Sequence, residues 1–192
     1  MADHGRLNAL LGLAEALTCR RTQLLGYFGE TAQPCGHCDL CDKPADIFDG
    51  TQAVRMALSA MLRTGEYFGA GQLIDILLGI ETDKVRARGH ADLPTFGVGK
   101  AYNRRQWQAV FRQMMGHDLI RPAPARHGAF RMPHAARPIL RGEATIDLRR
   151  DSIEKAKGQP RVRTLVSEED APLLSALKAN RRALAAAARV PA

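Results

Sequence analysis

The sequence contains few aromatic residues, few cysteines and no long apolar run. Phe, Trp and Tyr make up 5% of its 192 residues, and four residues are cysteine. No apolar stretch reaches the roughly 18 residues that a membrane-spanning helix needs, and no signal-peptide core or cleavage site follows Met1. These absences predict a cytoplasmic protein without a membrane partner, in which thiols stay reduced.

Several motifs of enzyme chemistry are also missing. The sequence has no Gly-x-x-x-x-Gly-Lys-Ser/Thr phosphate loop and no acidic magnesium-binding motif. It shows no nucleophile–base arrangement and no open metal site. An autonomous enzyme is therefore the least supported class of function, and no catalytic residue is predicted.

The cysteines that are present stand close together, as Cys19, Cys35, Cys38 and Cys41. Four thiolates complete a tetrahedral Zn²⁺ site and leave no position open for substrate, so the spacing predicts a structural zinc site. Part of an iron–sulfur ligand run has the same three-residue steps, although the fourth cysteine of that pattern is missing downstream. Unligated core cysteines are the remaining alternative. His37 lies between two of the cysteines, but four thiolates already fill a zinc site.

The chain is strongly basic. Its 28 Lys and Arg residues against 20 Asp and Glu residues give a net charge of +8, which favours polyanionic partners, nucleic acid first. The basic residues are dense between Lys100 and Arg141, where Asp118 is the one acid. A solvated basic face is the simpler alternative to a binding surface.

Hydrophobic periodicity predicts a mainly helical fold with a small β wing, an α+β arrangement. Helices are expected at about 4–18, 19–28, 50–63, 70–79 and 103–116, with a helical turn at 135–140 and a last helix at 171–189. Strands are expected at 67–68, near 119–120, near 130–132 and at 144–148, with 126–128 as a hairpin turn. This order after residue 50 is typical of a winged helix, in which the third helix reads the major groove.

Two local interpretations accompany this fold. Leu24, Leu25, Tyr27 and Phe28 are expected to form the apolar cover of the metal site. Trp107 shares a helix face with Val110 and Phe111 and is expected to lie in the core rather than to stack on a base.

The cysteine block closely resembles the zinc-binding subdomain of RecQ-family DNA helicases. The segments that carry this likeness are Cys19-Arg20-Arg21, Leu24–Glu30 and Cys35–Asp42. The likeness continues into the winged-helix (RQC) domain of that family through Gly89-His90, Phe96–Lys100 and Ala136–Glu143. The resemblance implies a helical zinc-binding subdomain at 1–46, a winged helix at 47–150, a linker at 151–168 and the first helix of an HRDC-like domain at 169–192.

The family resemblance also implies a function. RecQ helicases are ATP-dependent enzymes that unwind DNA in the 3′-to-5′ direction, in DNA repair, recombination, replication and the SOS response. ATP and Mg²⁺ would serve only motor domains, which this sequence lacks. The chain is thus expected to be a monomeric, nucleoid-associated region that binds duplex DNA or single-strand/duplex junctions, with structural zinc.

Seven residues are candidates for contact with DNA. They are Lys100, Arg104, Arg105, Arg112, Arg126, His127 and Arg131. Arg104 and Arg105 stand near the start of the third helix, whose N–H groups favour phosphate. His127 is expected at the hairpin tip, where it could stack on a terminal base pair or be a plain exposed turn residue.

Two other functions fit the same residues. A zinc-bearing winged-helix transcription regulator would be a dimer that reads paired half-sites. A protein-docking platform would receive an acidic peptide, such as the tail of single-stranded-DNA-binding protein, at Arg121 or Arg131.

Overall fold

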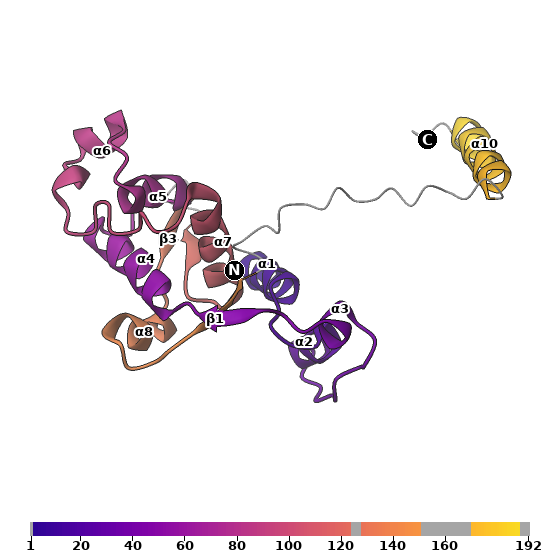
Figure 1. Ribbon diagram of the computed structural model, residues 1–192, viewed down its shortest axis with the longest axis horizontal. Helices are drawn as coiled ribbons and strands as arrows, with labels where there is room; N and C mark the ends of the chain where they lie inside the picture. The colour runs from indigo at the N-terminus through magenta and orange to yellow at the C-terminus, as the bar shows by residue number, and fades with distance from the viewer. Residues whose placement is uncertain (1, 124–127, 151–169, 189–192) are drawn as a thin grey trace. The chain divides into compact units, whose positions relative to one another are not determined.

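The computed structural model describes residues 2–123, 128–150 and 170–188 (Figure 1). The predicted linker at 151–168 and two of the DNA-binding candidates, Arg126 and His127, lie outside the described residues. The chain forms two compact units, Met1–Lys155 and Ala156–Ala192. The predicted domain boundaries at 46, 150 and 168 stay predictions.

Three helices surround the cysteines: α1 (Ala2–Ala14), α2 (Arg20–Tyr27) and α3 (Asp39–Asp42). α2 forms where the sequence predicts it, but three of its four predicted cover residues point to solvent. Leu24, Tyr27 and Phe28 are 46%, 54% and 69% exposed, so the prediction is wrong for them, whereas Leu25 is partly buried. The reason is geometric. Cys19 precedes the first residue of α2, whereas these side chains follow one to two turns later, about 7–14 Å farther along the axis.

The winged-helix body is built on α4 (Thr51–Arg63), α5 (Ala70–Leu78) and α7 (Arg104–Gly116). Between α5 and α7 lie two short elements, α6 (Asp83–Ala87) and η1 (His90–Asp92). α7 begins after Asn103, whose side chain accepts from the Gln106 N–H while the Gln106 side chain accepts from the Asn103 N–H. This reciprocal capping box fixes the start of the helix.

The core between these helices is continuous and apolar. Fully buried members include Val54, Leu58, Leu73, Leu77, Trp107 and Phe111. The prediction that Trp107 lies in the core is confirmed, since the side chain is 0% exposed and its Nε1 donates to the Gly99 carbonyl at 2.9 Å. A buried indole N–H needs such a partner, so this hydrogen bond fixes the ring in one orientation.

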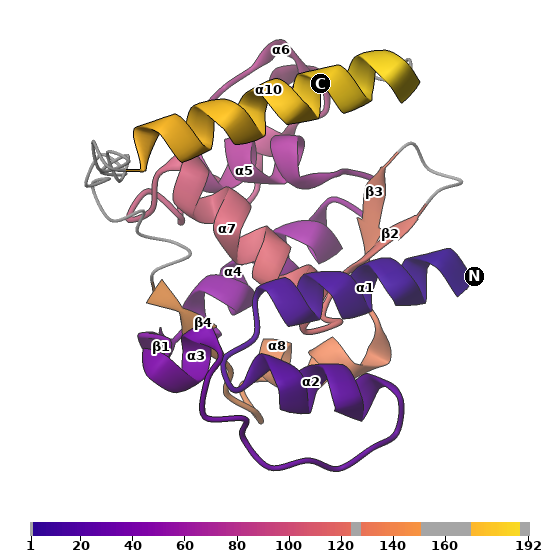
Figure 2. The same cartoon turned by 90° about the vertical axis from the view of Figure 1, so that its right-hand side faces the viewer.

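A β-hairpin packs on this core, as the sequence predicts, although its first strand begins at Arg121 rather than near Leu119-Ile120. It consists of β2 (Arg121–Ala123) and β3 (Ala129–Arg131), paired antiparallel with Arg121 opposite Arg131. The predicted strand at 67–68 is not formed. Even so, the Phe68 carbonyl accepts from the Phe130 N–H at 3.1 Å, so the turn after α4 borders β3. Figure 2 shows α1 beside α7, near the hairpin.

A second pair of strands closes the body. β1 (Ile47–Asp49) pairs antiparallel with β4 (Asp147–Arg149), and between the hairpin and β4 lie η3 (His134–Ala136) and α8 (Arg137–Arg141). The sequence did not predict β1, and β4 begins three residues after its expected start. Leu148 is fully buried and packs where a Cβ on Gly50 would stand.

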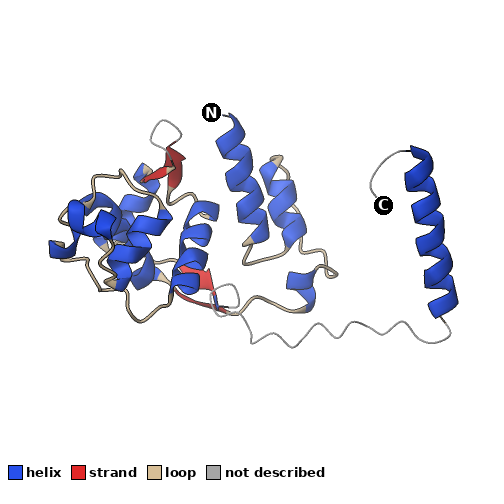
Figure 3. Cartoon of the chain, turned by 90° about the horizontal axis from the view of Figure 1, so that it is seen from above, coloured by secondary structure: helices blue, strands red, loops and turns tan. Residues whose placement is uncertain are grey.

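The described elements confirm the predicted fold class, a mainly helical chain with small antiparallel sheets (Figure 3). The second unit contains α10 (Ala171–Ala188), which exposes Leu173, Leu177 and Leu184. None of the described helices has the length and apolar character that crossing a membrane requires.

Candidate metal centre and nucleic-acid interface

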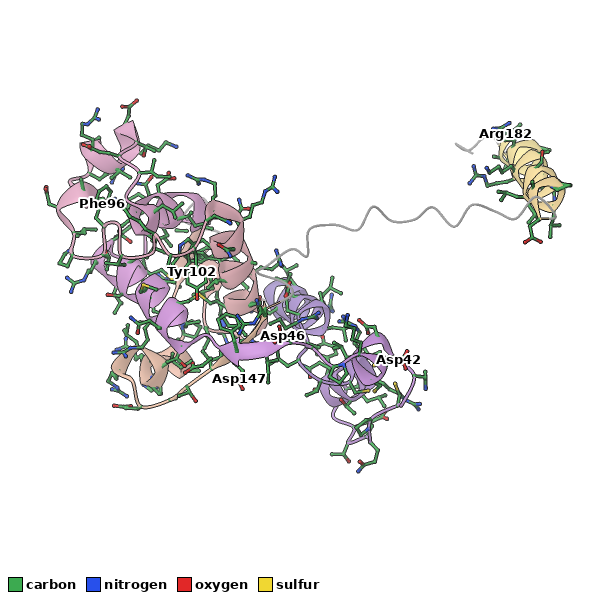
Figure 4. All side chains as sticks on the ribbon, in the orientation of Figure 1. Asp42, Asp46, Phe96, Tyr102, Asp147 and Arg182 are labelled. Atoms are coloured by element: carbon green, nitrogen blue, oxygen red, sulfur yellow. The ribbon has the colours of Figure 1, made fainter. Side chains whose placement is uncertain are left out.

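The four cysteines converge on one point. Cys19 stands just before α2, Cys35 lies in the loop that follows it, and Cys38 and Cys41 belong to the N-cap and body of α3, which ends at Asp42 (Figure 4). Their four sulfur atoms all lie within 4.8 Å of one another. The fold thus brings together the thiols that the sequence predicted as a set of metal ligands.

This sulfur arrangement fits one tetrahedral ion. The Sγ atoms of Cys35 and Cys41, and those of Cys19 and Cys38, are 3.9 Å apart. Four sulfurs at about 2.3 Å from a central Zn²⁺ would be about 3.8 Å apart, so the donor set and its spacing match zinc. The spacing favours a single ion over a multi-iron cluster, whose cysteines bind different irons.

Backbone N–H groups point at three of the thiols and change their pKa values. The Cys35 N–H, which donates to the Cys19 sulfur at 3.3 Å, lowers the pKa of Cys19 to about 6. The Arg20 N–H lowers the pKa of Cys38. The Gly36 N–H has the same effect on Cys41, but burial and the neighbouring thiols outweigh it and raise the pKa of Cys41 to about 11. The raised pKa keeps the Cys41 thiol protonated at neutral pH, and a bound divalent ion would favour its thiolate.

One ion pair beside the thiols was missed by sequence reasoning. Arg20 forms a two-pronged pair with Asp39, from Nε to Oδ1 at 2.7 Å and from Nη2 to Oδ2 at 2.8 Å. This pairing lowers the pKa of Asp39. Arg20 also donates to the carbonyls of Leu13 and Ala14, so a single side chain ties together α1, α2 and α3. Arg20 directly follows Cys19, and Asp39 directly follows Cys38. This shared position beside the cysteines is the sequence signal that could have revealed the ion pair.

His37 is not placed as a ligand. Its Nδ1 lies 2.7 Å from the Cys35 carbonyl, and the side chain is exposed. The four thiols therefore complete the set without it.

Two of the predicted DNA contacts are already engaged within the protein. Arg104 forms an ion pair with Asp75 on α5, and Arg112 forms one with Glu15, a buried residue just after α1. Their partners are 29 and 97 residues away in sequence. These ion pairs neutralise much of the positive charge that the sequence places on α7, so less of it is available to a DNA phosphate.

Lys100 has a structural environment of its own. Its Cε and Nζ lie where Cβ atoms on Gly79 and Gly97 would stand, at the end of α5. The adjacent loop donates from Gly97 to the Ile76 carbonyl and from Gly99 to the Leu77 carbonyl. The ammonium group is therefore near a helix C-terminus, where positive charge is favourable.

Arg105 and Arg131 differ from these residues. Both side chains are exposed, and within the described parts of the chain neither has an ion pair or hydrogen bond. Arg105 stands in the first turn of α7 and Arg131 ends β3. Of the seven predicted residues, these two are the described arginines that remain free to meet a phosphate.

A groove of about 1210 Å³ lies between α1, α2 and the hairpin. Small residues of the two helices line it, among them Ala9, Gly12 and Gly26. Arg121 and Arg131 line its hairpin side. The groove thus separates the two helices on either side of Cys19 from the hairpin.

Comparison with known proteins finds two family matches. Residues 1–42 match the RecQ zinc-binding family, and residues 44–157 match the RQC domain family. The ATP-dependent DNA helicases RecQ of Haemophilus influenzae and Pasteurella multocida are both 32% identical to this chain, over 98% and 97% of its length. The RecQ helicase of Bacillus subtilis is 26% identical over 98% of it. The chain spans about a third of each relative, with 31%, 30% and 30% covered.

Proposed function

Because the chain belongs to the RQC domain family of RecQ helicases, we propose that it is the DNA-binding region of an ATP-dependent 3′-to-5′ DNA helicase. The work of that helicase would be DNA repair, recombination and replication, including the SOS response, in the cytoplasm at the nucleoid. ATP and Mg²⁺ would act at motor domains outside this sequence. The chain itself would bind duplex DNA and single-strand/duplex junctions as a monomer.

The observation that carries this proposal is the pair of uncommitted arginines, Arg105 and Arg131. They stand on the third helix and on the hairpin, the two parts of a winged helix that meet DNA. The internal ion pairs of Arg104 and Arg112 rank those residues below them as contacts. Lys100, Arg126 and His127 complete the proposed set.

We assign the zinc a structural role. Four thiolates leave no coordination position for a substrate, and the residues around them contribute little apolar burial. When bound, the ion would hold Cys19 at the start of α2 against the two cysteines of α3. The chain's own contribution is the Arg20–Asp39 pair, which orients the same two helix starts.

Fluorescence anisotropy with a fluorescein-labelled tailed duplex tests the DNA-binding role. Binding should weaken steeply with salt, and Arg105→Gln should lower affinity and reduce the salt slope by about 1. The double variant Arg104→Gln with Asp75→Asn is the matched control, since it removes a neighbouring arginine without changing net charge. Failure of the unsubstituted chain to bind tailed or blunt duplex at about 50 mM salt would overturn the proposal.

The groove favours a second role, as a docking platform for an acidic peptide. Arg121 and Arg131 line it, and these are the residues expected to receive the tail of single-stranded-DNA-binding protein. Charge reversal at Arg121 should abolish binding of a labelled acidic tail peptide, whereas Arg105→Gln on α7 should weaken duplex binding and leave the peptide bound. A sedimentation measurement separates both roles from a transcription regulator, which would be a dimer.

A further inference from the structure

Two backbone outliers flank the hairpin. Among the described residues, the non-glycine residues with positive φ are Glu66, at 58°, and Asp118, at 56°. Each follows the C-terminus of a helix, Glu66 after α4 and Asp118 after α7, where glycine is the usual residue. A side chain in this conformation costs stability, so its presence points to a role for the side chain itself.

Both carboxylates reach the base of the hairpin. Glu66 Oε2 accepts from the backbone N–H of Met132, the residue directly after β3, at 3.0 Å. Asp118 forms a two-pronged pair with Arg121, the first residue of β2, in which Arg121 Nε donates to Oδ1 at 2.6 Å. The start of one strand and the end of the other are thus each held by a carboxylate.

Asp118 also connects the hairpin to α1, the helix that precedes Cys19. Its Oδ1 accepts from Asn8 Nδ2 of α1 at 3.1 Å. The same carboxylate therefore bonds to α1 and to β2, on either side of the groove described above.

The register of the hairpin explains why such a clamp is needed. Arg121 and Arg131 are directly opposite across the two strands. Like charges in that position destabilise a strand pair. Asp118 neutralises Arg121, and Arg131 is left as the free cation of the hairpin base.

We propose that Glu66 and Asp118 are positioning residues that fix the hairpin base in the orientation from which Arg131 meets a DNA phosphate. This inference rests on the proposed DNA-binding function and adds to it two acidic residues that do not touch DNA. The expected change in DNA affinity has the opposite sign to the one that charge alone would give. Removing a carboxylate near a DNA-binding surface should strengthen binding by simple electrostatics, whereas loss of the clamp weakens it.

Three variants of Glu66 separate these effects. Glu66→Gln removes the charge but keeps an acceptor for the Met132 N–H, Glu66→Gly removes both and suits the positive φ, and Glu66→Ala removes both and keeps the strain. Glu143→Gln, which releases Arg141 from an exposed ion pair on a different element, is the charge-matched control. Asp118→Gly and Asp118→Asn repeat the comparison at the other end.

The measurements are affinity for a fluorescein-labelled tailed duplex, thermal unfolding and hydrogen exchange at the Met132 amide. We expect Glu66→Gly to bind about tenfold more weakly, as for loss of one hydrogen bond to a charged group. Its unfolding midpoint should stay close to that of the unsubstituted chain, while exchange at Met132 accelerates. Glu66→Gln should restore the affinity, and Asp118→Gly should weaken binding although it frees Arg121.

The outcomes divide cleanly. If Glu66→Gly and Asp118→Gly bind as tightly as the unsubstituted chain or more tightly, the clamp is overturned and the DNA-binding role stands. If affinity falls only in proportion to a loss of folded protein in Glu66→Ala, the residue is merely structural and the inference is also overturned. If the unsubstituted chain does not bind the duplex, the proposed function fails first, and the positioning role fails with it.

Discussion

The metal-binding segment and the winged-helix body are held together by different forces. In the described part of residues 2–42, the buried side chains are Glu15, Ala16, Cys19 and Leu40. The body has a continuous apolar core that runs from Ala53 to Leu148. The first region contains too little apolar burial to order a chain of its length, whereas the second has the burial expected of an independent domain. Under the structural role proposed for zinc, the metal supplies in the first region the stability that packing supplies in the second.

Removal of zinc should produce the largest difference in stability between the two regions. A strong chelator at neutral pH is expected to unfold α2 and α3, because structural zinc contributes roughly 10–16 kcal/mol of apparent binding energy. The body should stay folded. Trp107 is the one tryptophan of the chain and lies in the core of the body, so its fluorescence reports on the body alone.

The measurement is helical circular dichroism followed together with Trp107 emission during chelation. The helical signal should fall while the emission maximum stays constant. A red shift of Trp107 in step with zinc release would show that the body also depends on the metal. An unchanged helical signal would show that α2 and α3 do not.

Gly99 allows the core of the body to be perturbed without touching the metal site. A Cβ on Gly99 would stand 2.6 Å from Trp107 Cζ2, so Gly99→Ala must displace the indole and should cost about 1–3 kcal/mol. Zinc content should not change, because the overpacking lies in the body. Denaturant unfolding followed by Trp107 fluorescence measures the loss.

Gly71 in α5 provides the matched control for that substitution. Nothing stands within 4 Å of a Cβ at this position, so Gly71→Ala should raise stability by about 0.5–1 kcal/mol. Equal effects at the two glycines would contradict the packing argument.

The metal-binding segment can be tested without touching a ligand. Arg20→Ala removes the pair with Asp39 and should lower zinc affinity about 10- to 100-fold, the usual cost of losing an orienting partner of a metal ligand. Arg21→Ala, one residue along, removes an exposed arginine without a partner among the described residues. Competition with a chromogenic chelator measures both, and a loss of affinity shared by the two variants would refute the role of Arg20.

The smallest effect concerns pH. Burial lowers the pKa of His117, at the end of α7, below its ordinary value, because the folded protein favours the neutral ring. The corresponding stability is fully present above the unfolded pKa of about 6.5 and is lost as pH falls through the lower folded value. His117→Gln should therefore flatten the decline in stability between about pH 7 and pH 5.

Thermal unfolding at saturating zinc measures this pH dependence. His134→Gln, at an exposed histidine, is the control and should leave the profile in place. A decline in His117→Gln as steep as that of the unsubstituted chain would show that other groups cause it.

Local patterns in the sequence predicted most helices and the four cysteines that the fold brings together. Cysteine spacing is a local signal, and the apolar period of α4, α5 and α7 reports directly on a shared core. β1 was missed because its three residues gain strand structure only by pairing with β4, which lies at the other end of the body's sequence. No short window of sequence contains that partner.

The candidate DNA interface was less predictable for the same reason. Whether an arginine is free depends on acids far away in the chain, and the sequence could not show that Arg112 meets Glu15 or that Arg104 meets Asp75. The prediction that Tyr27 and Phe28 cover the metal site failed because composition does not reveal which face of a short helix is buried. Glu66 gave no signal, since the positive φ that singles it out exists only in the folded backbone.

The β1–β4 pair has one more consequence. Ile47 is opposite Arg149, so the polypeptide enters and leaves the winged-helix body at a single point. Adjoining ends are the arrangement in which circular permutation and domain insertion are tolerated. A host that accepted the body at this point would keep the β1–β4 pair but would have to replace the contacts made by Asn8 of α1 and by Glu15 just after it.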